Sequence, residues 1–289
     1  MIMTKEDVLE IEQDLTSTCD LQCPLCTRNY SHFDLPPKLI RPLEDIISQL
    51  DTFTNLERMY IAGQYSEPLL HPRFLEYLGY LKDRGIMVEI YSNASKLNLK
   101  LWEDIGNLLD ENDQVHFTIC GSTQELHETY RVGSNLQNIL DNAEALRNVI
   151  AIDYCQFIEF EYNKNDDVTS FPFTNYYAVK TEGDRFLNEK RVEPLEGVKP
   201  TDTRDRLIKQ IFKNIPAEGK IKCKSLEDKK VYINVQGQIS PCYIHAEYYP
   251  KEDFNFDYTK IINFSYDKCG LCEEKTRCNI ERFGLDFVC

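Results

Sequence analysis

The sequence lacks the features of exported and membrane proteins. No apolar run follows a basic start, and no stretch of about 18 apolar residues occurs, so we expect neither a signal peptide nor a membrane-spanning helix. Basic residues are also few, with 33 Lys and Arg against 48 Asp and Glu and a formal charge of −15. Because such a surface repels phosphate and anionic lipid, we expect neither nucleic acid nor a membrane as a partner.

Cysteine, in contrast, is plentiful, with eleven residues in a chain of 289. Without a signal peptide these thiols should stay reduced, so we expect a cytoplasmic protein without a disulfide framework. Three cysteines fall within 19–26 and six within 223–289, while Cys120 and Cys155 lie alone between the groups. This distribution predicts two metal regions, one toward each end of the chain.

Strand and helix patterns alternate through the first part of the chain. Strands are predicted at 8–15, 57–63, 86–92, 115–120, 151–162 and 175–181. Helices are predicted at 42–50, 72–85, 102–109 and 124–147. This alternation is typical of βαβ units and a parallel sheet. Six units are too few for a closed eight-stranded barrel, so we expect an α/β fold, a partial (β/α)6 TIM-like barrel, with functional groups at the C-terminal strand ends.

The alternating pattern stops after the sixth predicted strand. Prolines and dense charge follow, and then a short stretch carries six cysteines. We therefore predict a barrel at 1–182, a bridge at 183–222 and a small iron–sulfur extension at 223–289.

The cysteines nearest the N-terminus follow the first predicted strand directly. Cys19, Cys23 and Cys26 have the spacing C-x3-C-x2-C. A [4Fe–4S] cluster normally takes four thiolates, so three leave one iron open to another ligand. The alternative is a structural zinc site that lacks its fourth ligand.

Loops after the later strands carry four further segments in the same order as a known family. They are Gly63-Gln-Tyr-Ser66-Glu67-Pro, Ser92-Asn93, Thr118-Ile-Cys120-Gly-Ser with Arg131 downstream, and Glu161-Tyr-Asn163. Together with the cysteines they resemble the radical S-adenosylmethionine (SAM) superfamily over roughly residues 6–181. Each later segment is weak alone, and their order and placement make the set specific.

The resemblance implies roles for individual residues. A [4Fe–4S] cluster on Cys19, Cys23 and Cys26 would hold the amine and carboxylate of SAM at its open iron. A guanidinium fork at Arg131 suits that carboxylate. The full set of residues implied to contact SAM is Leu25, Gly63, Ser66, Glu67, Ser92, Asn93, Thr118, Arg131 and Asn163.

The chain departs from the family pattern at two positions. Leu25 stands where an aromatic residue usually packs near the adenine. Cys120 stands where related enzymes often have an aspartate that faces the substrate. A thiol there is a candidate hydrogen-atom donor to a substrate radical, and the alternative is a small buried side chain. Cys155 is expected in the core, and His71, His116 and His127, which have no partner at ligand spacing, are expected on the surface or on helix faces.

The C-terminal cysteines resemble the SPASM and twitch extensions of radical SAM enzymes. The pattern is Cys223-x13-Gly237-x4-Cys242, then Cys269-x2-Cys272-x5-Cys278, with Cys289 at the end. A twitch arrangement would place one [4Fe–4S] cluster on Cys223, Cys242, Cys269 and Cys272. A reduced SPASM arrangement would use Cys269, Cys272, Cys278 and Cys289, with Cys223 and Cys242 holding part of a second cluster. A zinc knuckle is the alternative to both.

The resemblance implies an enzyme that cleaves SAM reductively and takes a hydrogen from an unactivated carbon. The expected substrate is a small polar molecule (sugar- or aminocyclitol-like) or a short peptide. The electron would come from an external donor such as flavodoxin or ferredoxin. The alternatives are a maturase of ribosomal peptides and a non-catalytic iron–sulfur or zinc protein.

Overall fold

The computed structural model describes residues 2–24, 26, 38–63, 66–180, 225, 228–240 and 256–257. Within them, an eight-stranded sheet has the strand order β7-β6-β5-β4-β3-β2-β8-β9. All neighbours are parallel except the β8–β9 pair. The strands are β2 (Glu10–Gln13), β3 (Arg58–Ile61), β4 (Met87–Ser92), β5 (Gln114–Ile119), β6 (Asp153–Glu159), β7 (Asn175–Lys180), β8 (Lys230–Ile233) and β9 (Ile239–Ser240). A separate antiparallel pair joins β1 (Ile2–Met3) to β10 (Phe256–Asp257).

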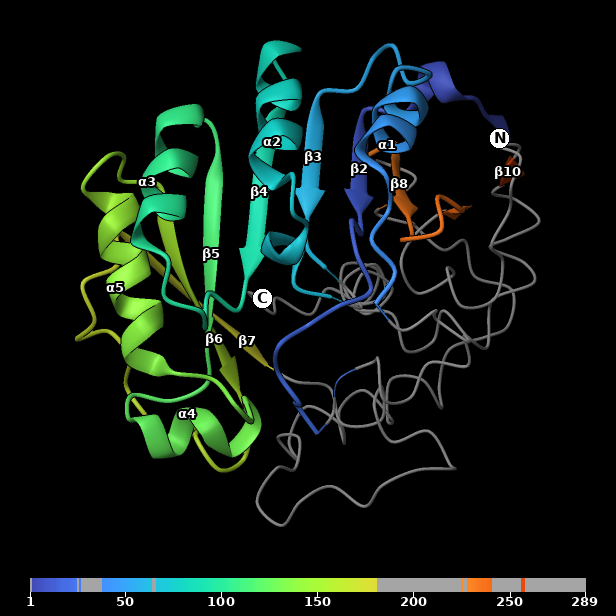
Figure 1. Cartoon of the computed structure of the whole chain (residues 1–289). Coiled ribbons are helices and arrows are strands. Elements are labelled where there is room, and N and C mark those ends of the chain that lie inside the picture. Colours follow the sequence, from blue (N-terminus) through green and yellow to red (C-terminus); the bar gives the residue numbers. More distant parts are fainter. Residues whose placement is uncertain are drawn as a thin grey trace, which may run out of the picture.

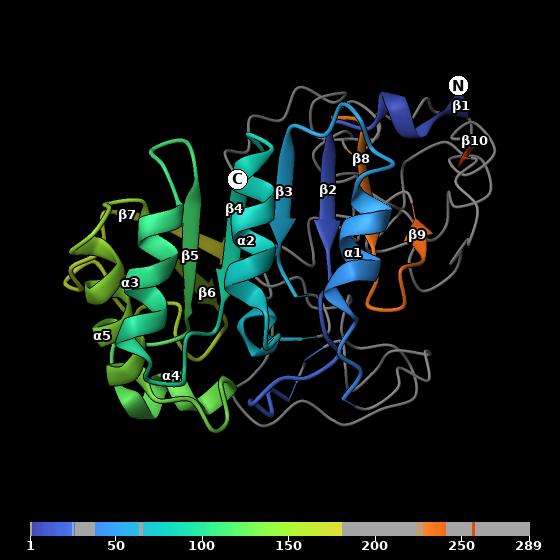
Figure 2. The same cartoon turned by 45° about the horizontal axis from the view of Figure 1, so that its top comes forward.

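Four helices cover one face of this sheet, α1 (Leu43–Leu50), α2 (Phe74–Asp83), α3 (Leu99–Leu108) and α5 (Leu136–Arg147) (Figure 1). The remaining helical segments are η1 (Lys5–Asp7), η3 (Pro68–Leu70) and α4 (Gln124–Tyr130). The two cartoon views show the sheet curving, so that β6 and β7 turn behind β4 and β5 (Figure 2). This curvature and the outer helices are those of an open TIM-like barrel, which confirms the predicted fold class.

All six predicted strands are present, but one of the predicted helical segments is different. The helical segment predicted over 124–147 is not a single helix. It is interrupted between α4 and α5, where Gly133 has a φ of +88°. No helix joins β6 to β7 across residues 160–174. The predicted domain boundaries remain predictions, and β8, from the segment assigned to the extension, is hydrogen-bonded beside β2.

The two faces of the strands have different chemistry. The face toward the helices is apolar and fully buried, as at Ile11, Met59, Val88 and Val115. Parallel strands covered on both faces are usually apolar on both. Here the alternate positions are charged or aromatic and polar, as at Glu12 in β2. The concave side of the barrel is therefore built to hold polar groups.

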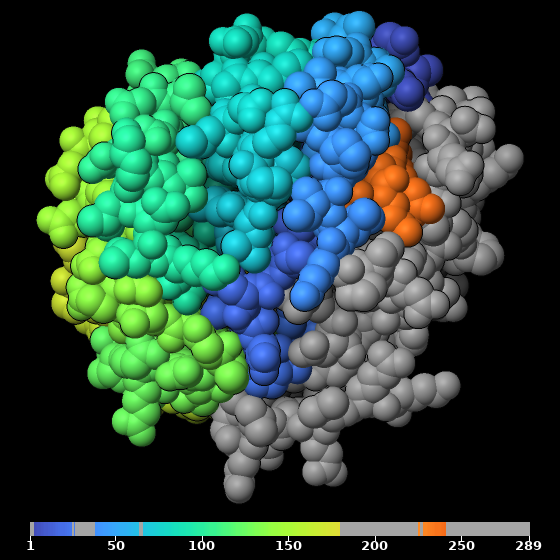
Figure 3. All heavy atoms as spheres, viewed as in Figure 1, coloured from blue at the N-terminus to red at the C-terminus, as the bar shows by residue number. Residues whose placement is uncertain are grey.

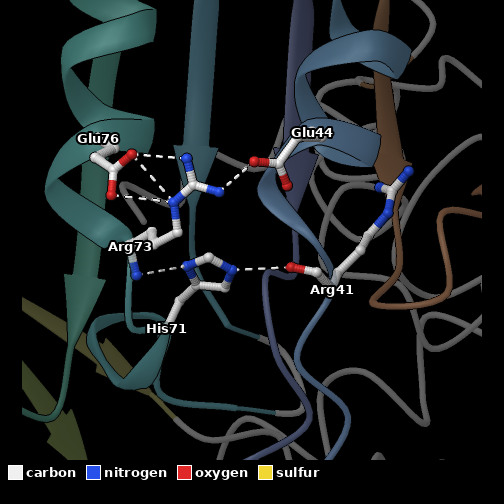
Figure 4. Close-up of polar contacts among 5 residues, drawn as sticks. All are labelled: Arg41, Glu44, His71, Arg73 and Glu76. Atoms are coloured by element: carbon white, nitrogen blue, oxygen red, sulfur yellow. Dashed lines mark hydrogen bonds and ion pairs between the residues drawn. The ribbon is translucent and has the colours of Figure 1, made fainter.

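His71 fastens the start of α1 to the start of α2 (Figure 4). Its Nε2 lies 2.9 Å from the carbonyl oxygen of Arg41, and its Nδ1 accepts the backbone N–H of Arg73 at 3.2 Å. The Arg73 guanidinium then binds Glu44 of α1 and Glu76 of α2. The prediction that His71 lies on the surface or on a helix face is thus wrong, since its exposed fraction is 3%.

His116, in a strand, corrects the same prediction, whereas His127 lies in a helix, as predicted. His116 lies in β5 on the concave side, stacked on Tyr91 with 4.2 Å between ring centres. His127 lies in α4 and is fully buried, where its Nδ1 accepts the backbone N–H of Cys120. Burial lowers the pKa of His116 to about 4 and that of His127 to about 3, so both are neutral at pH 7.

The β8–β9 hairpin packs beside α1 and reaches the surface there (Figure 3). Gln49 of α1 donates its side-chain amide to the carbonyl of Gly237 at 2.7 Å. Gly237 has a φ of +80°, and a Cβ there would lie 2.7 Å from the Arg41 guanidinium, so the turn needs glycine. No helix among the described residues has the length and apolarity needed to span a membrane.

Candidate functional site

The cysteine loop leaves the C-terminal end of β2 and lies across the mouth of the barrel. The Sγ of Cys19 accepts the backbone N–H of Leu21 at 3.5 Å and the side-chain amide of Asn93 at 3.6 Å. Cys23 is buried, and burial raises the pKa of its thiol to about 11, against the opposing effect of the nearby Arg131 guanidinium. The Cys23 thiol therefore needs a strong positive charge, such as iron, to become a thiolate.

Within the described residues, Cys19, Cys23, Cys26, Cys120 and Cys155 form no disulfide bond. Among the described residues, no group of three or more His, Cys, Asp or Glu side chains is placed to hold a single metal ion. Leu25, the predicted adenine contact, lies outside the described residues, as do Cys223, Cys242, Cys269, Cys272, Cys278 and Cys289. The roles of these seven residues stay predictions.

A tight turn at Gly63 follows β3. Gly63 has a φ of +56°, and a Cβ at this position would lie 2.5 Å from the carbonyl oxygen of Ser66. The turn is closed by the Ser66 N–H, which donates to the Gly63 carbonyl at 3.2 Å. The Ser66 hydroxyl is buried and has no hydrogen-bond partner among the described residues. Because such a group is costly to bury unpaired, Ser66 is ready to bind a ligand.

Glu67 ties this turn to the next strand. Its carboxylate accepts the hydroxyl of Ser92 and the backbone N–H of Asn93, each at 2.7 Å, and the N–H of Leu69 at 3.3 Å. Burial raises the pKa of Glu67 to about 7, although these donors favour the charged form. Glu67 therefore acts first as a clamp between the loops after β3 and β4. Asn93 continues the link, since its amide donates to Asp20 in the cysteine loop at 2.9 Å.

The break between α4 and α5 explains how Arg131 reaches the site. Arg131 is the C-cap of α4, with φ −86° and ψ 59°, and its side chain enters the barrel mouth rather than following the helix. The guanidinium hydrogen-bonds with the Cys120 thiol and lies near Cys23. Its Nε is buried and has no hydrogen-bond partner in the part of the chain that the structure describes. A buried cation with an unused donor favours an anionic ligand.

Two predicted site residues lie elsewhere in the structure. Asn163 donates its amide to the carbonyls of Cys120 and Ile158, each at 2.9 Å, and accepts the N–H of Phe160 at 2.6 Å. These bonds hold the ends of β5 and β6 together, so its contact with SAM stays a prediction. Cys120 is fully buried in a small cluster with Phe160 and does not line the cavity. The alternative of a small buried side chain expects this burial, and the role of Cys120 as a hydrogen-atom donor stays a prediction.

The remaining predicted residues line one cavity of about 730 Å³ at the C-terminal ends of the strands. They are Cys19, Cys23, Cys26, Gly63, Ser66, Glu67, Ser92, Asn93, Thr118 and Arg131. The set combines three thiols, the glycine turn at Gly63, and two buried polar groups, the Ser66 hydroxyl and the Arg131 Nε, that have no hydrogen-bond partner among the described residues. It therefore fits an iron–sulfur cluster on the thiols and a ligand with a carboxylate beside Arg131.

Further residues line the same cavity and were not predicted from the sequence. They are Glu12, Leu21, Gln22, Tyr60, Ala62, Tyr91, Gln156 and Lys230. Several are polar residues at alternate positions of strands, such as Glu12 of β2 and Tyr60 of β3. The alternation of polar and apolar residues along these strands was the sequence signal for a polar cavity, because strands covered by apolar layers on both faces do not show it.

The comparisons with known proteins agree with this geometry. The family model for the radical SAM superfamily matches residues 14–158. A curated relative, the tungsten-containing aldehyde ferredoxin oxidoreductase cofactor-modifying protein of Pyrococcus furiosus, is 26% identical over 106 residues, which are 37% of this chain. The match spans only 29% of that relative.

Solved structures share the fold at low identity. SuiB of Streptococcus suis bound to the precursor peptide SuiA has a TM-score of 0.58 at 14% identity, over 86% of this chain and 62% of that one. The anSMEcpe protein with bound AdoMet and the Cp18Cys peptide has a TM-score of 0.57 at 14% identity, over 96% and 88%. The chain thus spans less than two thirds of SuiB and most of anSMEcpe.

Proposed function

The chain belongs to the radical SAM superfamily, and we propose that it cleaves SAM reductively and removes a hydrogen atom from an unactivated C–H bond of its substrate. The supporting observation is the cavity that Cys19, Cys23 and Cys26 share with the unpartnered groups of Ser66 and Arg131. When bound, the [4Fe–4S] cluster and SAM supply one-electron cleavage of the C5′–S bond, with the electron coming from a donor such as flavodoxin or ferredoxin.

The residues of the chain have separate tasks in this proposal. Cys19, Cys23 and Cys26 bind the cluster and leave one iron open. Arg131 binds the SAM carboxylate with its unused Nε–H, and Ser66 offers its buried hydroxyl at the turn after β3. The curved sheet surrounds the reacting atoms and keeps water from them.

The proposed substrate is a small polar molecule, sugar- or aminocyclitol-like, or a short peptide. The polar concave face supports the first, since Glu12, Gln156 and Lys230 line the cavity below the loops. The peptides held by SuiB and anSMEcpe favour the second, and with it a peptide maturase, through the shared fold. We also propose an auxiliary [4Fe–4S] cluster on the C-terminal cysteines that accepts an electron from the substrate or orients it.

The test is formation of 5′-deoxyadenosine from SAM after anaerobic reconstitution and reduction with dithionite. We expect the product from the wild type and none from Cys23→Ala. Cys155→Ala is the matched control, because Cys155 is an equally buried thiol in β6 that does not line the cavity. Product from Cys23→Ala at the wild-type rate would refute the cluster assignment. A wild type that forms none would leave a non-catalytic metal protein.

The same sample gives the metal content. About eight irons per chain with matching sulfide indicate the SAM cluster plus one auxiliary [4Fe–4S] cluster. About four irons with one zinc would mean that the C-terminal cysteines form a structural zinc site, and the auxiliary cluster would be withdrawn.

A further inference from the structure

The cavity has a wall that the cofactor motifs do not explain. Glu12 of β2, Tyr60 of β3 and Lys230 of β8 line it from strands, whereas the motif residues line it mostly from loops. Glu12 and Tyr60 are paired across β2 and β3, and β8 lies on the other side of β2. We call these three residues the ion-pair wall.

An ion pair forms the centre of this wall. The Lys230 Nζ lies 3.1 Å from the Glu12 Oε2, with side-chain exposed fractions of 18% and 6%. The same Nζ lies 4.0 Å from the centre of the Tyr60 ring, which adds a cation–π contact. Because taking two charges out of water is costly, a buried pair is weak evidence for stability. Its position on a cavity wall points to binding instead.

We propose that the ion-pair wall binds the α-amino acid group of the substrate, with the ammonium at Glu12 and the carboxylate at Lys230. This inference rests on the proposed function, because it places the substrate beside the SAM site in one cavity. The two protein charges are adjacent, which matches an ammonium and a carboxylate on one carbon. In a peptide the two terminal charges are further apart.

Charge balance is the reason for choosing a zwitterion. When an α-amino acid group enters, Glu12 and Lys230 exchange one partner for another and neither ion is left alone. A ligand that carries only an ammonium breaks the ion pair between Glu12 and Lys230 and brings no carboxylate for Lys230 in exchange, which is unfavourable. A ligand that carries only a carboxylate does the reverse. A neutral polyol offers neither ion a charged partner.

The experiment compares four probes on the reconstituted, SAM-saturated protein by anaerobic NMR titration. Norleucine carries both charges, pentylamine lacks the carboxylate, hexanoate lacks the ammonium, and myo-inositol is neutral. We expect norleucine to bind at least about 10-fold more tightly than each of the others. We expect the double variant Glu12→Gln with Lys230→Gln to lose this preference. The double variant is used because a single change leaves one buried ion without its partner.

A matched control and a second measurement separate the possible failures. Lys100→Gln with Asp104→Asn neutralises an exposed pair on α3 that does not line the cavity, and it should keep the norleucine preference. SAM affinity, measured by equilibrium dialysis, should be the same in both double variants. The inference is overturned if norleucine binds no better than inositol, if its preference survives in the Glu12 and Lys230 variant, or if SAM affinity falls there. A wild type that forms 5′-deoxyadenosine keeps the proposed function in each of these cases.

Discussion

The loop end and the strand end of the cavity satisfy their polar groups in different ways. At the loop end, the Ser66 hydroxyl and the Arg131 Nε are buried, and neither has a hydrogen-bond partner within the described ranges. At the strand end Lys230 is paired with Glu12, and outside the cavity lining Arg58 binds both Glu10 and Glu89. The groups at the loop end gain hydrogen bonds when a ligand binds. The charges at the strand end exchange one ionic partner for another, so the empty site costs less free energy and selects ligands by their charge.

Substitution of Gly63 should break the loop end most severely. In Gly63→Ala the new Cβ would lie 2.5 Å from a backbone oxygen of Ser66, at a φ of +56° that disfavours side chains. We expect SAM affinity to fall by at least about 100-fold and stability to fall by about 2 kcal/mol or more. Equilibrium dialysis and thermal unfolding measure the two effects.

The matched control is Gly79→Ala in α2. A Cβ at Gly79 meets no atom within 4 Å, so the change should keep SAM affinity and stabilise the helix by about 1 kcal/mol. Equal SAM affinity in Gly63→Ala and Gly79→Ala would show that the turn after β3 is not part of the SAM site.

Exchange of arginine for lysine should distinguish the loop end of the cavity, which binds SAM, from the strand residues outside the cavity lining. Arg131→Lys keeps the charge but loses the planar fork, so we expect SAM to bind about 30-fold more weakly. Arg58→Lys makes the same change outside the cavity lining, where Arg58 binds Glu89 and Glu10, and should leave SAM affinity unchanged. An equal loss in both variants, again by equilibrium dialysis, would mean that Arg131 does not bind SAM through its guanidinium fork.

The loop end was predictable because its residues lie in short segments directly after strands. The turn at Gly63 and the cysteine spacing are local patterns, and the strand order brings them together. The strand end was not predictable in this way. Lys230 and Glu12 are more than two hundred residues apart in sequence, and only the parallel pairing of β8 with β2 places them in contact.

The contacts of His71 and His116, and the path by which Arg131 reaches the cavity, were not predictable for a different reason. His71 and His116 are polar residues whose partners are a backbone carbonyl and aromatic rings, and neither partner leaves a spacing pattern. Arg131 was correctly singled out, but the break that brings it to the cavity lies in a segment whose pattern reads as one helix. Gly133 was the local signal for that break.

His116 offers a smaller effect, confined to the strand end. Burial lowers its pKa to about 4, so between pH 6.5 and 4 the unfolded chain binds a proton that the folded chain does not. This contribution to stability is present above pH 6.5 and is lost as pH falls through 4. His116→Phe keeps the ring stack on Tyr91 but loses the hydrogen bond between Nδ1 and the Tyr177 hydroxyl.

We therefore expect His116→Phe to be less stable than the wild type at pH 7 by about 1 kcal/mol. The free energies of unfolding of the two proteins should converge as the pH falls toward 4, because the wild type loses about 1–2 kcal/mol more stability than the variant over that range. Urea unfolding at several pH values measures this. Parallel curves for the two proteins would show that His116 is not the titrating group, and an altered SAM affinity would contradict its place at the strand end.

Cys120 should give the smallest effect, because it touches the cavity only through Arg131. Its thiol hydrogen-bonds with the guanidinium, and burial raises its pKa, so it stays protonated and out of contact with a substrate. Cys120→Ala removes this support and should weaken SAM binding by about three-fold, while the maximal rate of 5′-deoxyadenosine formation is kept. Cys120→Ser keeps a donor and acceptor beside Arg131 and should restore part of the affinity. A hydrogen-atom donor behaves differently, because serine cannot replace it. Equal SAM affinity in all three proteins, with product formation from substrate lost in both variants, would restore the donor role and place this thiol at the reacting atoms.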